Sequence, residues 1–163
     1  MKDEMSRVNK ILKHKEYLKN LNKNIHAEIN RKFCRHDLIH FLDVSRIMYI
    51  KSLENNLEFD KEIIYACGFL HDIGKWQQYE KGIPHEIASA DIARDILQDC
   101  SFNENEIEMI LIAIRNHRNK NNSKNSLSEL LYKSDKLSRM CFNCKAQAEC
   151  NWSIEMRNNQ IKY

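Results

Sequence analysis

The stretch CGFLHDIGK, residues 67–75, ends an apolar segment with an imidazole and a carboxylate on consecutive residues, His71 and Asp72. Such a pair is a starting point for a divalent-metal site, where a bound metal turns water into a nucleophile at neutral pH. The apolar run before the pair predicts a helix from about residue 59 to residue 70. We expect that helix to stop near Gly74, because glycine best tolerates a left-handed C-cap.

Length and composition limit the kind of molecule that carries this pair. A chain of 163 residues fits one compact domain that buries a core of its own. With 3 Gly, 1 Pro and 42% hydrophobic residues, the chain is expected to be all-α, because sheet proteins need more turn residues. A charged fraction of 30% and a formal net charge of +3 do not indicate specific binding to nucleic acid.

The sequence carries no signal for export or membrane insertion. Residues 1–10 lack the apolar segment of a secretion signal, and no apolar span is long enough to cross a bilayer. We therefore expect a cytoplasmic protein that does not bind membranes. The six cysteines are then better explained as thiols or metal ligands than as disulfides.

Hydrophobic periodicity predicts helices along most of the chain. Residues 3–29 carry a thin apolar stripe, which predicts a peripheral helix or helix pair, and residues 36–53 predict a central helix. Pro84 predicts the start of a further helix, because proline is favoured at the first helical position. Capping-box spacing before an apolar run, at residues 103–106 and 126–129, predicts two more helix starts.

Three polar residues fall in line with the apolar stripes of these helices. His40 lies within the central helix, His117 follows the stripe after residue 103, and Asp135 follows the stripe after residue 126. A buried carboxylate costs free energy unless it is paired or bound to a metal, so Asp135 needs a partner. Each histidine, taken alone, is better explained as a core imidazole that hydrogen-bonds a backbone carbonyl.

The order of these residues resembles the HD-domain metal-dependent phosphohydrolase superfamily. Its members have a His, then a His-Asp doublet, then a distal Asp, here His40, His71, Asp72 and Asp135, with matching sequence around each over roughly residues 33–140. The resemblance implies an all-α, compact helical bundle in which these four residues hold a divalent cation. We expect residues 1–163 to form a single HD domain, with a peripheral helix at 3–29 and a cysteine-containing tail at 141–163.

A subset of that superfamily adds two histidines and binds two metals, and His85 and His117 match those positions. The subset includes the symmetrical diadenosine tetraphosphate hydrolases, to which the likeness is looser. By this resemblance Asp72 would bridge one metal held with His40, His71 and Asp135 and a second held by His85 and His117. Imidazole and carboxylate ligands suit Fe, Mn, Co, Ni or Zn, and the sequence does not choose among them.

The expected activity is hydrolysis of a nucleotide or related phosphoester or phosphoanhydride by a metal-activated hydroxide. Asp72 and Lys75 are the expected catalytic residues, with Lys75, Arg118 and Arg139 as candidate phosphate contacts. For the two arginines, solvated surface charge is at least as good an explanation. Two other functions stay open, namely a di-iron oxygenase and a non-catalytic module that binds a nucleotide. The expected partner is a small-molecule phosphoester such as a nucleotide, and the oligomeric state is open.

Two further features have alternative explanations. A second His-Asp pair begins the central helix, and its His36 either supports the site or replaces His40 as a ligand. A Cys-x2-Cys pair and a third thiol in the tail suit zinc or an iron–sulfur cluster, with Cys34 as the fourth ligand, although reduced thiols explain them equally well. The cysteines of this second site are Cys34, Cys141, Cys144 and Cys150, whereas Cys67 and Cys100 are expected in the core.

Overall fold

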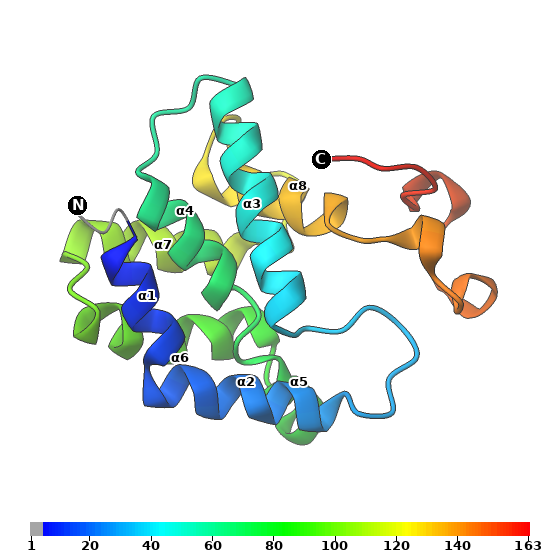
Figure 1. Cartoon of the computed structure of the whole chain (residues 1–163), viewed down its shortest axis with the longest axis horizontal. Coiled ribbons are helices and arrows are strands. Elements are labelled where there is room, and N and C mark those ends of the chain that lie inside the picture. The colour runs from blue at the N-terminus through cyan, green and yellow to red at the C-terminus, as the bar shows by residue number, and fades with distance from the viewer. Residues whose placement is uncertain (1–4) are drawn as a thin grey trace.

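The computed structural model describes residues 5–163, and every regular element in that range is helical (Figure 1). The expectation of an all-α fold is therefore confirmed. The α-helices are α1 (Ser6–Lys13), α2 (Lys15–Ala27), α3 (Leu38–Glu54), α4 (Lys61–Leu70), α5 (Lys75–Lys81), α6 (His85–Asp99), α7 (Glu104–Asn116) and α8 (Leu127–Leu137). Three short 3-10 helices follow, η1 (Cys141–Asn143), η2 (Gln147–Glu149) and η3 (Ile154–Met156).

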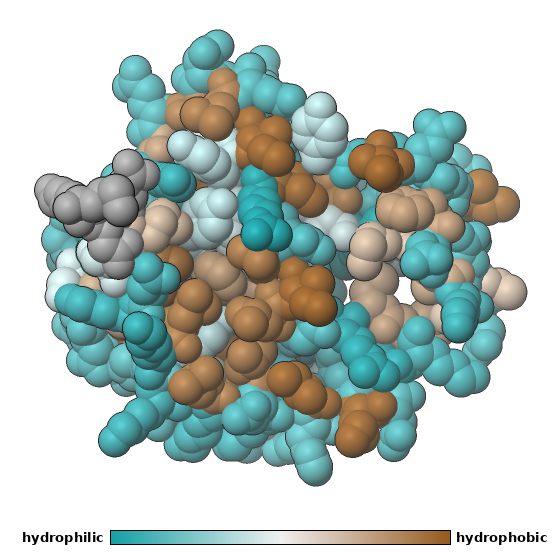
Figure 2. Space-filling model, viewed as in Figure 1, coloured by the Kyte–Doolittle hydropathy of each residue, from teal (hydrophilic) through white to brown (hydrophobic). Residues whose placement is uncertain are grey.

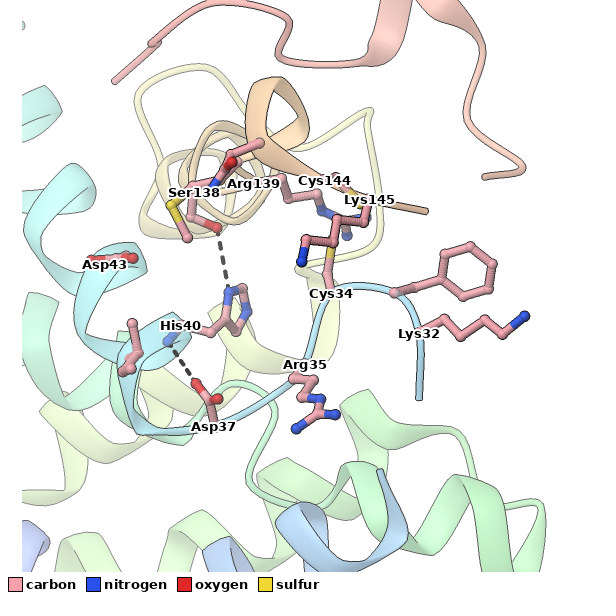
Figure 3. Close-up of a pocket in the computed structure, with 14 residues that line it drawn as sticks. Lys32, Cys34, Arg35, Asp37, His40, Asp43, Ser138, Arg139, Cys144 and Lys145 are labelled. Carbon is pink, nitrogen blue, oxygen red and sulfur yellow. Dashed lines mark hydrogen bonds between the residues drawn. The ribbon is translucent and has the colours of Figure 1, made fainter. Parts of the chain in front are cut away.

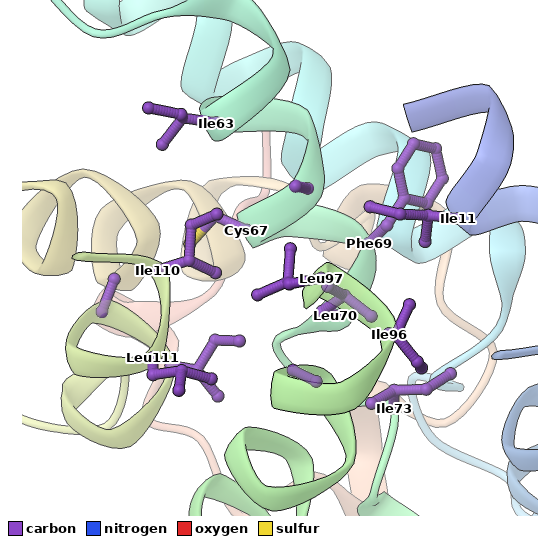
Figure 4. Close-up of a cluster of buried hydrophobic side chains, with 14 of the residues drawn as sticks. Ile11, Ile63, Cys67, Phe69, Leu70, Ile73, Ile96, Leu97, Ile110 and Leu111 are labelled. Atoms are coloured by element: carbon purple, nitrogen blue, oxygen red, sulfur yellow. The ribbon is translucent and has the colours of Figure 1, made fainter. Parts of the chain in front are cut away.

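The core lies where the central helices meet. α3 packs against α4 and α8, and α7 packs against α6 and α8. Burial of each large apolar side chain stabilises the fold by roughly 1.5–3 kcal/mol. This packing fixes the ends of α4, α6 and α7 relative to one another. Figure 4 shows the shared core, to which α4 gives Ile63, Cys67, Phe69 and Leu70, α6 gives Ile96 and Leu97, and α7 gives Ile110 and Leu111.

Residues 3–29 were predicted to form a peripheral helix or helix pair. Residues 3 and 4 lie outside the described residues, and the rest of the segment contains two helices, α1 and α2. The break is at His14, whose φ of −70° and ψ of 132° are extended. Ile11 and Tyr17 are both 0% exposed, so the pair packs more deeply into the core than its thin apolar stripe indicated. The α1–α2 pair is thus part of the bundle and positions α5 and α6, which α2 contacts.

The predicted helix starts are found with small differences. The capping box at residues 103–106 is complete, with both of its hydrogen bonds present. At the start of α8, Ser126 Oγ accepts from the Glu129 N–H at 3.1 Å, but the Glu129 carboxylate accepts from the Asn125 N–H instead of from Ser126. Pro84 lies one residue before α6, which begins at His85. At the starts of α7 and α8, side chains satisfy N–H groups that have no partner within the helix.

The stretch after α4 differs from the prediction. α4 ends at Leu70, as expected, but Gly74 has a φ of −95°, so the predicted left-handed C-cap at Gly74 was wrong. Glycine is needed at this position for a different reason, because a Cβ would lie 2.6 Å from the backbone of Ala88 and Ser89 on α6. The Gly74 N–H also donates to Ser89 Oγ at 2.9 Å. This close approach lets α5, an element that the periodicity did not indicate, begin at once and lie against α6.

The last part of the chain, residues 138–163, lies beside the helical bundle, close to the C-terminal end of α8 (Figure 1). Figure 2 shows the same face of the molecule, with apolar side chains gathered over the middle of the bundle, around α3 and α4, and polar side chains around them. No helix in residues 5–163 combines the length and apolar character needed to cross a membrane.

Candidate metal centre

His71 and Asp72 lie in the turn between α4 and α5, and they are 0% and 3% exposed. Asn24 on α2 holds this turn in place. Its Nδ2 donates to the backbone oxygen of Asp72 at 2.9 Å, and its Oδ1 accepts from the Trp76 N–H at 2.8 Å. The doublet is therefore fixed by a fully buried amide from the N-terminal helix pair, before any ligand is considered.

Four donor residues from distant parts of the chain meet on one side of Asp72. His40 comes from α3, His71 and Asp72 from the turn, and Asp135 from α8, and one ligand atom from each lies within 4.8 Å of all the others. His40 Nε2 is 3.5 Å from Asp135 Oδ1, and His71 Nε2 is 3.3 Å from Asp72 Oδ2. We call these four residues the first donor group.

A second donor group forms on the other oxygen of the same carboxylate. His85 Nε2 and His117 Nε2 lie 3.2 and 3.3 Å from Asp72 Oδ1. His85 is the first residue of α6, and His117 directly follows α7. Asp72 thus directs Oδ2 toward the first donor group and Oδ1 toward the second, which is the arrangement of a carboxylate that bridges two cations.

Backbone carbonyls set the proton positions on two of these histidines. His71 Nδ1 lies 2.7 Å from the Gly68 oxygen, and His117 Nδ1 lies 2.6 Å from the Ile114 oxygen. A carbonyl oxygen can only accept, so the proton is on Nδ1 of each ring and the lone pair is on Nε2. The atoms that face Asp72 are therefore free to act as metal ligands.

The second donor group gathers two imidazole nitrogens on one carboxylate oxygen. His85 Nδ1 lies 2.5 Å from Gln78 Oε1 and 3.1 Å from Lys75 Nζ, so Gln78 and Lys75 hold the far side of this ring. The Nε2 atoms of His85 and His117 are 3.2 Å apart, and both lie beside Asp72 Oδ1. A cation placed among these three atoms would find two imidazole nitrogens and a carboxylate oxygen as ligands.

Both donor groups contain buried polar atoms without a hydrogen-bond partner. Within residues 5–163, the buried atoms His40 Nε2, His71 Nε2 and Asp72 Oδ1 have no hydrogen-bond partner. Burying such an atom unsatisfied costs about 1–3 kcal/mol. Imidazole nitrogen with carboxylate oxygen is a donor set for divalent transition metals, so both groups fit the cations that the fold family implies.

The environment also sets the protonation states that metal binding needs. Burial lowers the pKa of His40 and of His85 to about 3, so both rings are neutral at neutral pH. Burial would raise the pKa of Asp72, but the surrounding histidines, first His71 and then His36, together hold that pKa well below its usual range. Burial would lower the pKa of His71, but the nearby Asp72 raises it, and the net pKa lies above its usual value. The field that favours a proton there also favours a metal cation.

His36 lies beside the first donor group, held by a residue that the sequence analysis missed. Its Nε2 is 3.5 Å from Asp72 Oδ2, while Glu28 accepts from its backbone N–H at 2.7 Å and lies 2.5 Å from its Nδ1. Glu28 also accepts from the Tyr79 hydroxyl at 2.6 Å. Burial would raise the pKa of Glu28, but the hydrogen bond from His36 lowers it. No sequence signal marks Glu28, because its partners meet it only in the folded chain.

A cavity of about 350 Å³ opens onto both donor groups. Lys75, Arg118 and Arg139, the candidate phosphate contacts, line it, and so does Lys136, which the sequence analysis missed. Burial would raise the pKa of Asp135, but contact with Lys136 helps to hold that pKa below its usual range. The cavity wall also includes Gln78, Tyr132, Trp152 and Met156. Four cations and two aromatic rings therefore share one space with the donor residues Asp72, His85, His117 and Asp135.

The predicted cysteine site lies elsewhere. A separate cavity of about 190 Å³ is lined by Cys34, Cys141, Cys144 and Cys150. All six cysteines are free thiols. Cys67 and Cys100 are 0% and 1% exposed in the core, as expected.

Comparison with known proteins gives the class of this chain. A sequence profile of the HD domain family matches residues 37–140, from the start of α3 to just beyond α8. The chain belongs to the HD domain family, which implies metal-dependent phosphohydrolase activity in general. It is also similar to an uncharacterized protein from Clostridium beijerinckii (strain ATCC 51743 / NCIMB 8052), with 49% identity over 159 residues, covering 98% of this chain and 100% of that protein. No solved structure matches the chain.

Proposed function

We propose that this protein is a phosphohydrolase that uses two divalent cations to cleave a nucleotide or a related phosphoester or phosphoanhydride. The observation that supports the proposal most strongly is the position of Asp72. Its two carboxylate oxygens face two separate groups of histidines, with His71 near one oxygen and His85 and His117 near the other. Paired metals of this kind clamp the attacking and leaving oxygens of a phosphoryl group during in-line displacement.

Each donor group would hold one cation. His40, His71, Asp72 and Asp135 would bind the first, and Asp72, His85 and His117 would bind the second. When bound, the cations supply Lewis acidity toward the phosphoryl oxygens and an activated water. The protein contributes imidazoles that are already oriented, because His71 and His117 donate from Nδ1 to backbone oxygens and direct Nε2 toward Asp72.

The cationic side chains of the cavity would bind the phosphate. Lys75 Nζ lies 3.1 Å from His85 Nδ1, and Arg139 Nη2 lies 3.7 Å from Asp135 Oδ2, so one cation borders each donor group. Arg118 and Lys136 add positive charge to the cavity. Ammonium and guanidinium groups form strong, charge-assisted hydrogen bonds with phosphate oxygens. The cavity is therefore suited to an anion of high charge density.

His36 is the residue placed to move a proton. Glu28 is ionised and can only accept, so the Nδ1 proton of His36 points toward Glu28, while Nε2 lies beside Asp72 in the cavity. In its protonated form the ring would donate from Nε2 to the leaving oxygen, and the Glu28 carboxylate would stabilise that charged form. His36 would thus act as the general acid, with Glu28 as its positioning residue.

The rest of the cavity wall supports a nucleotide as the substrate class. Trp152 and Tyr132 supply aromatic surface and Met156 supplies an apolar side chain, all in the same space as the cations. A base stacks on aromatic surface while its phosphates need positive charge, and a nucleotide has both parts. A cavity of about 350 Å³ falls within the range of small-molecule sites.

The proposal is tested by loading the metal-stripped full-length protein with Mn, Co, Ni, Zn or anaerobic Fe. Phosphate release is then measured over a panel of nucleotides and dinucleoside polyphosphates. We expect at least one combination to turn over, with bound metal near two equivalents per chain. Asp72→Asn should remove measurable turnover and lower the bound metal, because both donor groups lose their shared oxygen ligand. The exposed Asp91→Asn on α6 is the matched control and should behave as the wild type.

Two outcomes would overturn the proposal. One is the absence of phosphoester cleavage with every metal loaded and full occupancy shown by metal analysis, which would leave a binding module. The other is a mixed-valent iron pair that reacts with oxygen, which would indicate an oxygenase on the same scaffold.

A further inference from the structure

Four of the six cysteines surround one cavity, away from the HD donor groups. Cys34 lies in the loop between α2 and α3, whereas the other three lie in the segment after α8, more than 100 residues later. Figure 3 shows Cys34 and Cys144 on these two facing segments. The remaining cysteines, Cys67 and Cys100, are core residues. The fold therefore separates two thiols in the hydrophobic core from a set of four around one cavity. We call the space lined by Cys34, Cys141, Cys144 and Cys150 the cysteine cavity.

The spacing of the four sulfurs distinguishes between kinds of metal centre. A tetrahedral zinc with Zn–S bonds of about 2.3 Å holds its four sulfurs within about 4 Å of one another. In residues 5–163, no three of these sulfurs lie within 4.8 Å of one another, and instead they border a space of about 190 Å³. An iron–sulfur cluster needs such an arrangement, because each sulfur binds a different iron atom at the edge of a larger group.

The side chains around the cysteine cavity suit a negatively charged occupant. A cluster with four thiolate ligands carries net negative charge, and Arg31, Arg139 and Arg157 all line the cavity. Arg31 Nε donates to the Cys34 backbone oxygen at 2.8 Å, and Arg157 Nη2 donates to the Cys150 backbone oxygen at 3.0 Å. Two arginines therefore both position a cysteine and supply positive charge beside it.

The tail that carries three of these cysteines has little else to hold it in place. Between residues 138 and 163 only Cys141, Ala146 and Asn158 are buried, and the segment forms only short 3-10 turns. Its main anchor is Asn158, whose Nδ2 donates to backbone oxygens at the end of α8. A segment with so small an apolar core needs a covalent or metal tie to be stable.

We propose that Cys34, Cys141, Cys144 and Cys150 bind an iron–sulfur cluster that ties the tail to the HD domain. Binding is a ligand exchange on a preassembled cluster: each thiol forms one S–Fe bond and releases its proton to solvent, the ligands of the cluster's carrier leave, and no electron is transferred. The cluster holds Trp152 and Met156 in the wall of the cavity over the metal centre. The assignment of the cluster itself does not depend on the proposed hydrolase activity.

Arg139 connects the two sites. It lines both cavities, its guanidinium lies 3.9 Å from the Trp152 ring centroid, and its Nη2 lies 3.7 Å from Asp135 Oδ2 in the first donor group. Loss of the cluster would release Trp152 and with it the packing that orients Arg139 toward the metal ligands. The cluster would therefore support the shape of the phosphate-binding cavity without touching the substrate.

The test uses the full-length protein, produced in iron-supplemented cells and purified without oxygen. Iron, zinc and acid-labile sulfide are measured together with the visible absorption spectrum. Sulfide reports the cluster alone, because the histidine–carboxylate donor groups hold no sulfide. We expect sulfide in the wild type, visible absorption that dithionite bleaches, and loss of both in Cys34→Ser and in Cys150→Ser. Cys100→Ser, which changes a core thiol, is the matched control and should retain its sulfide.

Further measurements separate this proposal from the proposed hydrolase function. Asp72→Asn should lose metal from the donor groups and keep its sulfide. Wild-type protein that circular dichroism shows to be folded, but that contains no sulfide, with or without zinc, would overturn the cluster proposal. This result does not require any variant to fold. Sulfide that persists in both Cys34→Ser and Cys150→Ser would also overturn it. Hydrolysis without sulfide would refute the cluster alone, and sulfide without hydrolysis would refute the hydrolase alone.

Discussion

The Asp72 carboxylate lies among four imidazoles, each with its Nε2 within 3.5 Å of a carboxylate oxygen. It is the only negative side chain that borders both donor groups among the described residues. An amide of the same shape would keep the packing but would remove the charge that faces these rings. For this reason Asp72→Asn separates loss of metal binding from loss of fold.

Glu28 provides the sharpest prediction for a single residue outside the donor groups. Glu28→Gln should lower kcat by about 10- to 100-fold, the usual effect of removing a carboxylate that orients an active-site imidazole. The ring of His36 also loses the carboxylate that orients its Nε2 toward the cavity, so kcat should fall while KM changes little. Steady-state kinetics over a substrate series measures both parameters.

The matched control for Glu28 is Glu58→Gln, an exposed acid in the loop before α4. It should leave kcat and KM at wild-type values. If Glu28→Gln lowers the melting temperature but leaves kcat unchanged, the residue is only structural. The role of His36 as proton donor would then be rejected.

At the scale of elements, the position of α5 depends on the contact of Gly74 with α6. Gly74→Ala would place a methyl group 2.6 Å from the backbone of Ala88 and Ser89, so α5 and α6 must separate. We expect the free energy of unfolding to fall by about 1–3 kcal/mol, as for other overpacked sites. The affinity for metal should fall as well, because α5 follows the doublet and α6 begins at His85. Urea unfolding and metal titration measure the two effects.

Gly82→Ala is the control for this prediction. Gly82 has a φ of +68°, and no atom lies within 4 Å of the place that a Cβ would occupy, so alanine there costs backbone strain of roughly 1–2 kcal/mol without a steric clash. It should reduce stability and leave metal affinity unchanged. Wild-type metal affinity in Gly74→Ala would contradict the proposed link between the α5–α6 contact and the site.

The elements themselves were largely predictable from local patterns. Apolar periodicity placed α3, α4, α6, α7 and α8 to within a few residues, because each helix buries one face. Capping side chains marked the starts of α7 and α8, and a proline marked the start of α6. α5 was missed because it has only seven residues, too few for a period to be visible. The role of Gly74 was mistaken for a similar reason, since its backbone is constrained by α6 and not by its own helix.

At the scale of the whole molecule, the metal-free protein should lose stability in mild acid. Burial lowers the pKa of His40 and His85 to about 3, whereas in the unfolded chain these rings take up protons near 6.5. The unfolded state therefore binds more protons between these values, and the free energy of unfolding falls as the pH drops below about 6.5. The raised pKa of His71 opposes this and offsets part of it. The net loss should be on the order of 1 kcal/mol per pH unit.

Urea unfolding of chelator-stripped protein at pH 7 and pH 5.5 measures this loss. The double variant His40→Gln/His85→Gln should show a flatter dependence on pH. The exposed His26→Gln should show the same dependence as the wild type. If the stripped wild type is equally stable at both pH values, the two rings are not held neutral in the folded chain.

Residues of the candidate site could be predicted only where a polar residue falls on the apolar face of a predicted helix or directly follows an apolar run. His40, His117 and Asp135 interrupt apolar stripes, and the doublet follows an apolar run, so each could be found from the sequence together with the resemblance. The sequence could not reveal three other residues, Asn24, Glu28 and Lys136, because they do not interrupt an apolar stripe. Their contacts depend on how α2, α5 and α8 approach one another, which is a property of the assembled bundle.

The position of Trp152 gives the protein an optical probe of its own cavity. The chain has two tryptophans, and the other, Trp76, is 6% exposed and donates from Nε1 to Asn20 at 2.9 Å. Trp152 instead lies in the cavity wall with the Arg139 guanidinium over its ring. An anion that draws Arg139 away alters the surroundings of one indole and leaves the other as a steady background. Intrinsic fluorescence therefore reports occupancy of the cavity without a label.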